Sequence, residues 1–155
     1  MKPLSILLLW LVVVGTLAGC GGDTSSPPVS TRPLSPRDYV SRVQEMLHAP
    51  GRLASLAVPR VATPPAGRVV SRAEVDGLVA RARRDLDELR ARPIADPALS
   101  RQRDAFAGAY QATVTHMERV GRAMVQDDAV RLRRDLPPLL NSMRGLSSAV
   151  SPQSS

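Results

Sequence analysis

The chain has 155 residues and a formal net charge of +7 at pH 7, with one cysteine and two histidines. A single cysteine excludes an intramolecular disulfide, and 3% aromatic residues require a core of aliphatic side chains, methionine and alanine, which suits helix packing. The only lysine is Lys2, so beyond residue 19 arginine carries all the positive charge, with a net charge of +6. The remaining 136 residues are enough for one domain with a modest core.

The first nineteen residues have the pattern of an export signal. Lys2 supplies one positive charge, and an apolar run from Leu4 to Val14 follows it. This run has the length of a signal-peptide core and is shorter than the roughly 20 residues that a bilayer-spanning helix needs. Small residues then lead to the only cysteine, Cys20. We therefore expect residues 1–19 to be a signal peptide.

The residues at the end of this segment, Leu17-Ala18-Gly19-Cys20, resemble the lipobox of bacterial lipoproteins. The resemblance implies that the Cys20 thiol receives a diacylglyceryl group and that the chain is cut directly before it. Two acyl chains give stable membrane attachment, at about 0.8 kcal/mol per buried methylene. The alternatives are a transmembrane anchor, which the short apolar run disfavours, and an ordinary secretory signal, which would leave a reactive free thiol. The expected location is the extracytoplasmic face of a cell membrane, on the periplasmic or cell-surface side.

Both ends of the mature chain lack the apolar side chains that a packed structure needs. Residues 20–34 are rich in glycine, serine, threonine and proline, and residues 151–155 are mostly serine. Such segments bury too little surface to offset the entropy lost on ordering. We predict a flexible, lipid-anchored tether over residues 20–34, a folded domain over residues 35–150 and a disordered tail over residues 151–155.

The folded domain is predicted to begin with a short helix over residues 35–48. Ser35 is suited to the N-cap, Pro36 takes the first helical position, and Ala49-Pro50-Gly51 is expected to end the helix. Its apolar face comprises Tyr39, Val40, Val43, Met46 and Leu47. Residues 51–70 are predicted to be a proline-rich loop. One short helical turn is expected in it, at Leu53, Leu56, Ala57 and Val58. The loop contains no polar cluster with evident chemistry, which favours a segment without its own function.

Two long helices are predicted next, over residues 71–92 and 96–125. Ser71 opens the first with a capping box that includes Glu74, and Asp96-Pro97 opens the second with an N-cap and a proline at the first helical position. The apolar face of the first comprises Val75, Leu78, Val79, Ala82, Leu86 and Leu89. The second carries a heptad-like stripe of Phe106, Tyr110, Thr113, Met117, Val120 and Met124.

A last long helix is predicted over residues 129–150, with Asp127 as its N-cap. Its apolar stripe comprises Ala129, Leu132, Leu136, Leu139, Met143, Leu146 and Val150. Pro137-Pro138 lies inside this stripe and removes two backbone donors, so a kink or a split is expected there. No segment alternates with period two for long enough to predict a strand. The predicted fold is all-α, a small antiparallel bundle of three long helices and a shorter first one.

Catalytic and cofactor sites have little support in the sequence. His48 and His116 belong to no metal-binding or haem-binding motif, and Met46 and Met117, the methionines near them, fit the core stripes. There is no nucleophile motif. The carboxylates of Asp85, Asp87 and Glu88 are expected on a solvated helix face. We therefore expect no cofactor, no metal and no enzymatic activity.

Arginine is the remaining candidate for function. Two groups lie on helices, one comprising Arg81, Arg83 and Arg84 and the other comprising Arg131, Arg133 and Arg134. They are either a binding surface for an anionic ligand or solvated faces neutralised by neighbouring carboxylates, as in an i, i+4 pair of Arg131 with Asp135. Nucleic acid is a poor candidate ligand, because no aromatic residues are interleaved with the arginines.

The leading functional hypothesis is a membrane-anchored, non-enzymatic interaction module that binds an envelope protein. The alternative is a binding protein for an anionic envelope ligand, either a polymer or a lipid headgroup, through its arginine-rich helix faces. Both hypotheses place the protein at the membrane through its lipid anchor. Salt distinguishes them, because the affinity of arginines for a polyanion falls steeply with salt concentration.

Overall fold

The computed structural model describes residues 32–62 and 70–150. Outside this part lie the predicted signal peptide, the residues that resemble a lipobox, with Cys20, most of the predicted tether, residues 63–69 of the proline-rich segment, and the predicted tail. The described residues form five helices and no strand, which confirms the all-α prediction. The helices are α1 Pro36–Met46, α2 His48–Ala62, α3 Arg72–Ala91, α4 Pro97–Val125 and α5 Ala129–Val150.

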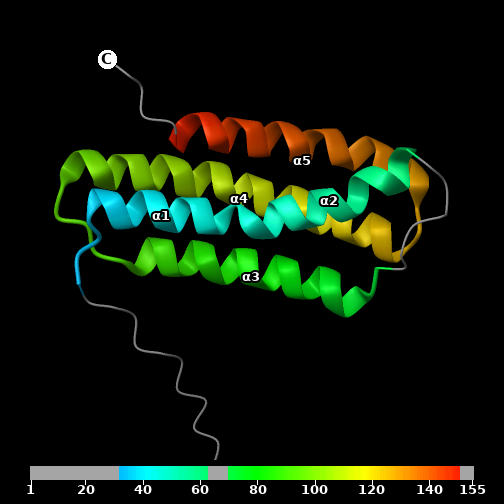
Figure 1. The fold of residues 1–155 in the computed structure, drawn as a ribbon, viewed down its shortest axis with the longest axis horizontal. Helices are drawn as coiled ribbons and strands as arrows, with labels where there is room; N and C mark the ends of the chain where they lie inside the picture. The colour runs from blue at the N-terminus through cyan, green and yellow to red at the C-terminus, as the bar shows by residue number, and fades with distance from the viewer. Residues whose placement is uncertain (1–31, 63–69, 151–155) are drawn as a thin grey trace, which may run out of the picture.

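The helices form an antiparallel bundle in which α1 and α2 follow each other along one side (Figure 1). The direction of the chain then alternates in α3, α4 and α5, so the bundle has an up-down-up-down arrangement (Figure 1). Helix α4 packs against both α3 and α5, and α2 packs against all three. The chain enters at residue 32 and leaves α5 at the same end of the bundle (Figure 1). The turn between α4 and α5 lies at the opposite end.

The predicted helix starts are confirmed for three helices. The side chains of Ser35, Ser71 and Asp96 each accept a backbone N–H from the first turn of α1, α3 and α4. Helix α5 begins at Ala129 as predicted, but its N-cap was predicted one residue too early, because Asp128 and not Asp127 accepts the backbone N–H of Arg131, at 3.0 Å. Asp127 instead has a positive φ of 52°, a conformation that aspartate tolerates in the tight turn. Leu34, placed by the sequence in the tether, is buried, and its N–H donates to the carbonyl of Pro93 at 2.9 Å.

The largest difference from the sequence prediction is α2, which occupies most of the segment expected to be a loop. Leu53 and Ala57 are fully buried on one face of this 15-residue helix. Pro50 lies in the first turn, where helix N–H groups have no partner within the helix, so its missing donor costs little there. The exposed Pro59 lies in the last turn. Packing against α3, α4 and α5 stabilises the helix despite its prolines.

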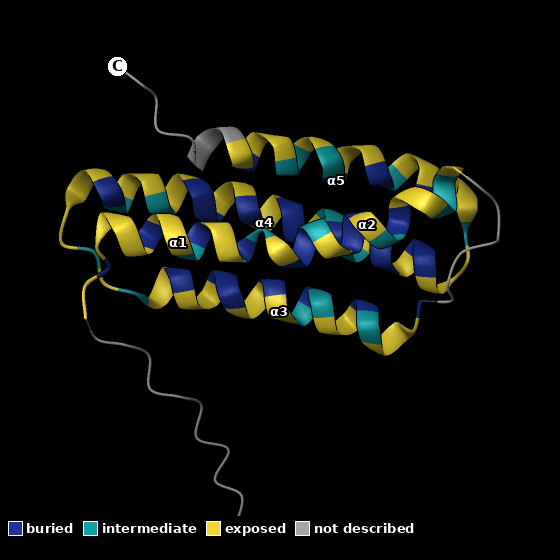
Figure 2. Ribbon diagram, in the orientation of Figure 1, coloured by how far each residue is buried: buried dark blue, intermediate teal, exposed yellow. Residues whose placement is uncertain are grey.

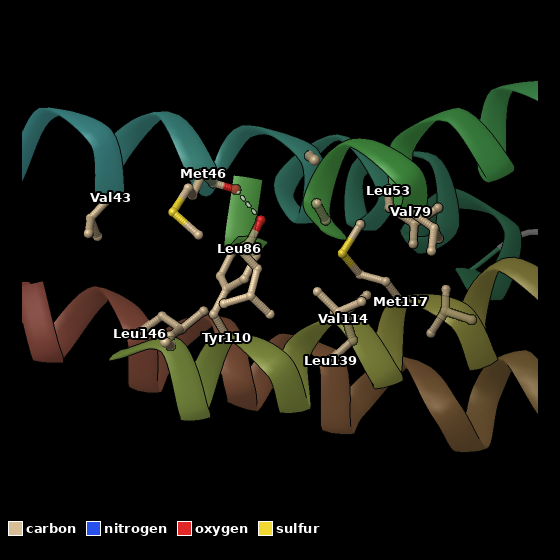
Figure 3. Close-up of a cluster of buried hydrophobic side chains, with 14 of the residues drawn as sticks. Val43, Met46, Leu53, Val79, Leu86, Tyr110, Val114, Met117, Leu139 and Leu146 are labelled. Carbon is tan, nitrogen blue, oxygen red and sulfur yellow. Dashed lines mark hydrogen bonds between the residues drawn. The ribbon is translucent and has the colours of Figure 1, made fainter. Parts of the chain in front are cut away.

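The break between α1 and α2 falls at Leu47, earlier than predicted, and Tyr110 stabilises it. Pro50 has no N–H to donate to the carbonyl four residues before it, which belongs to Met46. That carbonyl accepts the buried Tyr110 hydroxyl at 2.7 Å, as Figure 3 shows. The Tyr110 ring also stacks on Phe106, with 5.7 Å between ring centroids. A residue of α4 therefore satisfies the backbone group that the proline leaves unpaired.

The pair Pro137-Pro138 does not split α5, which runs as one helix from Ala129 to Val150. Both prolines are exposed, and the carbonyls that lose a partner belong to the exposed residues Arg133 and Arg134. Water can hydrate those carbonyls, while Leu136 and Leu139 on the other face remain buried. Solvent thus compensates for the two missing backbone donors.

The core lies along the bundle axis between the helices (Figure 2). All six residues of the stripe predicted for α4 are buried, which confirms it in full. Val40 and Ala129, also predicted for core stripes, are exposed. The side chain of Val150 lies outside the described part. No helix within residues 32–62 or 70–150 has both the length and the apolar content needed to cross a membrane.

Gly121 sets the distance between α3 and α4. A Cβ at this position would lie 2.4 Å from Cγ1 of Val75, whereas a Cβ at Gly108 meets nothing within 4 Å. Valine has one strongly preferred rotamer in a helix, so Val75 cannot easily turn away.

We therefore expect opposite effects from two matched substitutions, Gly121→Ala and Gly108→Ala. Gly108→Ala should stabilise the fold by about 0.5–1 kcal/mol through helix propensity. Gly121→Ala should destabilise it by about 1 kcal/mol, because the energetic cost of overpacking against Val75 exceeds the stabilisation from alanine's higher helix propensity. Urea unfolding of both variants checks this. Equal stabilisation by both would contradict the close approach of α3 and α4.

Candidate anion-binding cleft

Four arginines from two helices line one cleft between α4 and α5. Its volume is about 480 Å³, and its lining residues are Arg119, Arg122, Ala123, Gln126, Arg131, Arg134 and Asp135. Ala123 is buried beneath the surface, while all four arginines are exposed and accessible to a ligand. The cleft lies near the turn between the two helices, at the end of the bundle opposite to residue 32 (Figure 1). We call these four arginines and the hollow between them the arginine cleft.

The hairpin of α4 and α5 brings these side chains together. The turn between the helices is short, with α4 ending at Val125 and α5 beginning at Ala129. Residues at similar distances from such a turn lie side by side in an antiparallel pair, which places Arg122 near Arg131 and Arg119 near Arg134. Within each helix the two arginines are three residues apart and therefore share a face.

The carboxylates near the cleft neutralise only part of its charge. Arg134 Nε lies 2.9 Å from Asp135 Oδ1, and Arg131 Nε lies 3.1 Å from Asp128 Oδ2. The predicted pair of Arg131 with Asp135 is replaced by these two pairs. Within residues 32–62 and 70–150, no hydrogen bond or ion pair engages the side chains of Arg119 and Arg122. The guanidinium groups of Arg119 and Arg122, both on the α4 side of the cleft, thus have all their N–H donors available to a ligand.

The pKa of Asp135 reports the positive field in the cleft. It lies below its ordinary value, mainly because the Arg134 side chain donates a hydrogen bond to the carboxylate. The positive charges of Arg134, Arg119 and Arg131 lower it further. The pKa of Arg134 is raised in return by its hydrogen bond to Asp135. The hydrogen bond from Arg134 and the nearby guanidinium charges therefore favour the ionised form of Asp135, and the same positive charge favours a bound anion.

The structure separates the arginines that the sequence proposed as binding surfaces. Arg131 and Arg134 belong to the arginine cleft, whereas Arg133 is exposed and does not line it. Arg81 and Arg84 are exposed on α3, a helix with no extensive packing against α5, so the α3 and α5 groups form no single surface.

Arg119 and Arg122 were missed by the sequence analysis. Their three-residue spacing and their distance from the turn were the signals that could have identified them.

A second hollow lies between α3 and α4, on the other side of Arg122. Its volume is about 590 Å³, and its lining residues are Arg72, Val75, Asp76, Val79, Ala80, Arg83, Glu118, Gly121, Arg122, Val125 and Gln126. Arg83, one of the arginines singled out from the sequence, lies here, and its guanidinium group is 2.6 Å from the Glu118 carboxylate. This groove is more apolar than the arginine cleft, and Arg83 and Arg72, two of its three arginines, form ion pairs with Glu118 and Asp76.

Asp85 was expected on a solvated face but is buried. Its Oδ1 lies 3.0 Å from Arg42 Nη2 of α1, which also contacts Glu88, and 8% of the residue is exposed. Burial raises the pKa of Asp85, and the charge of Arg42 opposes that rise. Asp85 thus links α3 to α1 through Arg42. It is a structural carboxylate, remote in sequence from the arginine cleft.

Arg42→Met is expected to raise the pKa of Asp85 further. The folded pKa already exceeds the ordinary value of 3.8, so Asp85 favours folding more as the pH falls through that folded pKa. Without Arg42, the cost of burying the ionised form should keep growing up to a higher pH and reach about 2 kcal/mol near neutrality. A carboxyl-carbon NMR titration, assigned with Asp85→Asn, checks this. A lower Asp85 pKa in the variant would contradict it.

The residues considered for metal or haem ligation do not form a group. Met46 and Met117 are fully buried in the core, His116 is half-buried and His48 is exposed. Among the described residues, no three or more histidine, cysteine, aspartate or glutamate side chains are placed to hold a metal ion.

The fold and the cleft define a class: an antiparallel all-α bundle with a basic cleft at the end opposite to its N-terminal entry. Comparison with protein-family models, with curated protein sequences and with solved structures found no match to this chain.

Proposed function

We propose that this chain is a lipid-anchored, non-enzymatic binding module of the cell envelope, and that its ligand is anionic. The observation that carries the proposal is the convergence of Arg119, Arg122, Arg131 and Arg134 on one cleft, where two of the four have no carboxylate partner in the described structure. Guanidinium groups bind phosphate and carboxylate through paired, charge-assisted hydrogen bonds. This favours the anionic-ligand hypothesis over a protein partner of unspecified chemistry.

The position of the cleft supports a ligand away from the anchoring membrane. The 29 residues of α4 separate the two ends of the bundle by about 40 Å. The chain enters at one end, and the α4–α5 turn, which the lining residues of the arginine cleft flank, lies at the other (Figure 1). A tether on the entry side would attach the bundle at the end farthest from the cleft. An envelope polymer or a free anionic molecule therefore suits the cleft better than the headgroups of the membrane that holds the anchor.

The anchor itself is tested at Cys20. We expect Cys20→Ser to abolish incorporation of an alkyne-tagged fatty acid, because the hydroxyl is not a substrate for thioether formation. Mass spectrometry of the natural chain should find the mature N-terminus at Cys20, with a diacylglyceryl modification. Unchanged labelling of the serine variant would contradict the lipoprotein proposal.

The binding proposal is tested with a pull-down from envelope extract, using residues 21–155, which retain every described residue, as soluble bait. An Arg119→Glu/Arg122→Glu bait is the control. Anionic material captured by the natural bait at low salt, and lost at high salt and with the variant, would support the proposal. A protein retained by both baits at high salt would contradict it and restore the protein-partner hypothesis. If the natural bait captures neither anionic material nor a protein at either salt concentration, both hypotheses would be contradicted.

A further inference from the structure

The arginine cleft and the α3–α4 groove are parts of one continuous surface. They share two lining residues, Arg122 and Gln126, near the end of α4. The cleft lies on the α5 side of Arg122, and the groove lies on its α3 side. A ligand longer than a simple anion could therefore contact both hollows at once.

The two hollows differ in chemistry. Val75, Val79 and Val125 line the groove; Val75 and Val79 are buried beneath it, and Val125 is 37% exposed at its rim. The charged groups around these valines are largely paired with each other, as in Arg83 with Glu118 at 2.6 Å and Arg72 with Asp76 at 3.7 Å. Away from Arg122, the groove thus offers apolar surface beside paired charges, while the cleft offers two guanidinium groups without an ion pair, those of Arg119 and Arg122. The volume of the α3–α4 groove, about 590 Å³, is also in the range of small-molecule sites, about 300–1,000 Å³.

We infer that the ligand is an anionic amphiphile, with a phosphate-bearing head in the arginine cleft and a hydrocarbon chain in the α3–α4 groove. This inference rests on the proposed function and specifies its ligand. A phosphate monoester carries about −1.5 to −2 charges at pH 7, which suits four arginines and one aspartate better than a single carboxylate does. Arg122, at the boundary, contacts the head and covers the start of the chain with its own methylenes.

Isothermal titration calorimetry of the protein with three small-molecule probes tests this inference. Ethyl phosphate presents the head alone, octyl phosphate below its micellar concentration presents head and chain, and octyl glucoside presents the chain alone. Octyl phosphate should bind about 30-fold more tightly than ethyl phosphate, the gain from burying two or three methylenes. Octyl glucoside should not bind measurably, because its neutral head cannot form ion pairs with the arginines of the cleft.

Two variants and one control variant test whether the hydrocarbon chain of the ligand occupies the α3–α4 groove. Ala80→Leu fills the groove and should reduce the preference for octyl phosphate to about threefold or less, with ethyl phosphate affinity unchanged. Ala112→Leu, at an exposed position of α4 outside both hollows, should change neither affinity. Val125→Asn, at the exposed rim, should also lower the preference, and it covers the case in which Ala80→Leu disturbs folding.

The outcomes separate the inference from the function on which it rests. Equal affinities for ethyl and octyl phosphate would overturn the amphiphile inference and leave an anion-binding cleft. Octyl glucoside binding as tightly as octyl phosphate would overturn the inference as well, because the arginines would then contribute nothing. No binding of either phosphate would overturn both the inference and the proposed function.

Discussion

Leu53→Ala is expected to lower the free energy of unfolding by about 3 kcal/mol. Leu53 is fully buried on α2, and the lost side chain would leave a cavity where α2 packs against its neighbours (Figure 3). The result is informative because the sequence pattern predicted a loop here, in which the same truncation would cost little. Urea unfolding, followed by circular dichroism, measures the change.

Val58→Ala on the same helix is the matched control. Val58 is 45% exposed, so its truncation should change stability by no more than about 0.5 kcal/mol. A small and similar effect of both substitutions would contradict the placement of α2 in the core. A large effect of Leu53→Ala alone would confirm that the segment is a core helix.

The second large effect is expected in binding. Arg119→Ala/Arg122→Ala should weaken pyrophosphate binding by at least about 100-fold, because each removed charge-assisted hydrogen bond contributes about 1.5–3 kcal/mol. These are the two cleft arginines without a carboxylate partner in the described structure, so their removal leaves no unpaired carboxylate behind. Stability should therefore change little, and isothermal titration at low salt measures the loss directly.

The control for this variant changes net charge equally at the other end of the bundle. Arg37→Ala/Arg101→Ala removes two exposed arginines, one near the start of α1 and one near the start of α4. It should weaken binding only slightly, because long-range charge effects are screened beyond about 8–10 Å at physiological salt. A loss as large as that of the cleft variant would show that net charge, and not the cleft, governs binding.

Much of the fold could be predicted from local patterns. The stripe from Phe106 to Met124 follows heptad-like spacing, and all its members are buried. The cap at Ser71 combines a hydroxyl with the appropriate backbone donor, which the structure confirms at 3.1 Å. Such features depend on residues within a few positions of each other, so a single sequence is enough to identify them.

The errors arose where distant residues decide the local structure. Pro50 and Pro59 suggested a loop, but packing of Leu53 and Ala57 against other helices outweighs the propensity cost. The Tyr110 hydroxyl, 64 positions away in sequence, satisfies the Met46 carbonyl that Pro50 leaves without a donor. No local pattern contains this information.

The arginine cleft could be predicted only in part, again because distant residues determine its composition. Arg131 and Arg134 were recognised as charged positions, but their partners on α4 depend on how the hairpin closes. Asp85 was placed on a polar face because its neighbours in sequence are polar, whereas Arg42 of α1 determines its environment. Pairings between helices decide which charges are neutralised and which are available to a ligand.

The central claim is that the arginine cleft binds an anion, and a two-dimensional NMR titration of residues 21–155 with ethyl phosphate at low salt tests it most directly. The amide and arginine side-chain signals of residues 119–135 should shift in a saturable way, and the shifts should reverse when salt is raised. Shifts centred on Arg81 and Arg84 of α3, or no saturable shift at any residue, would contradict the claim.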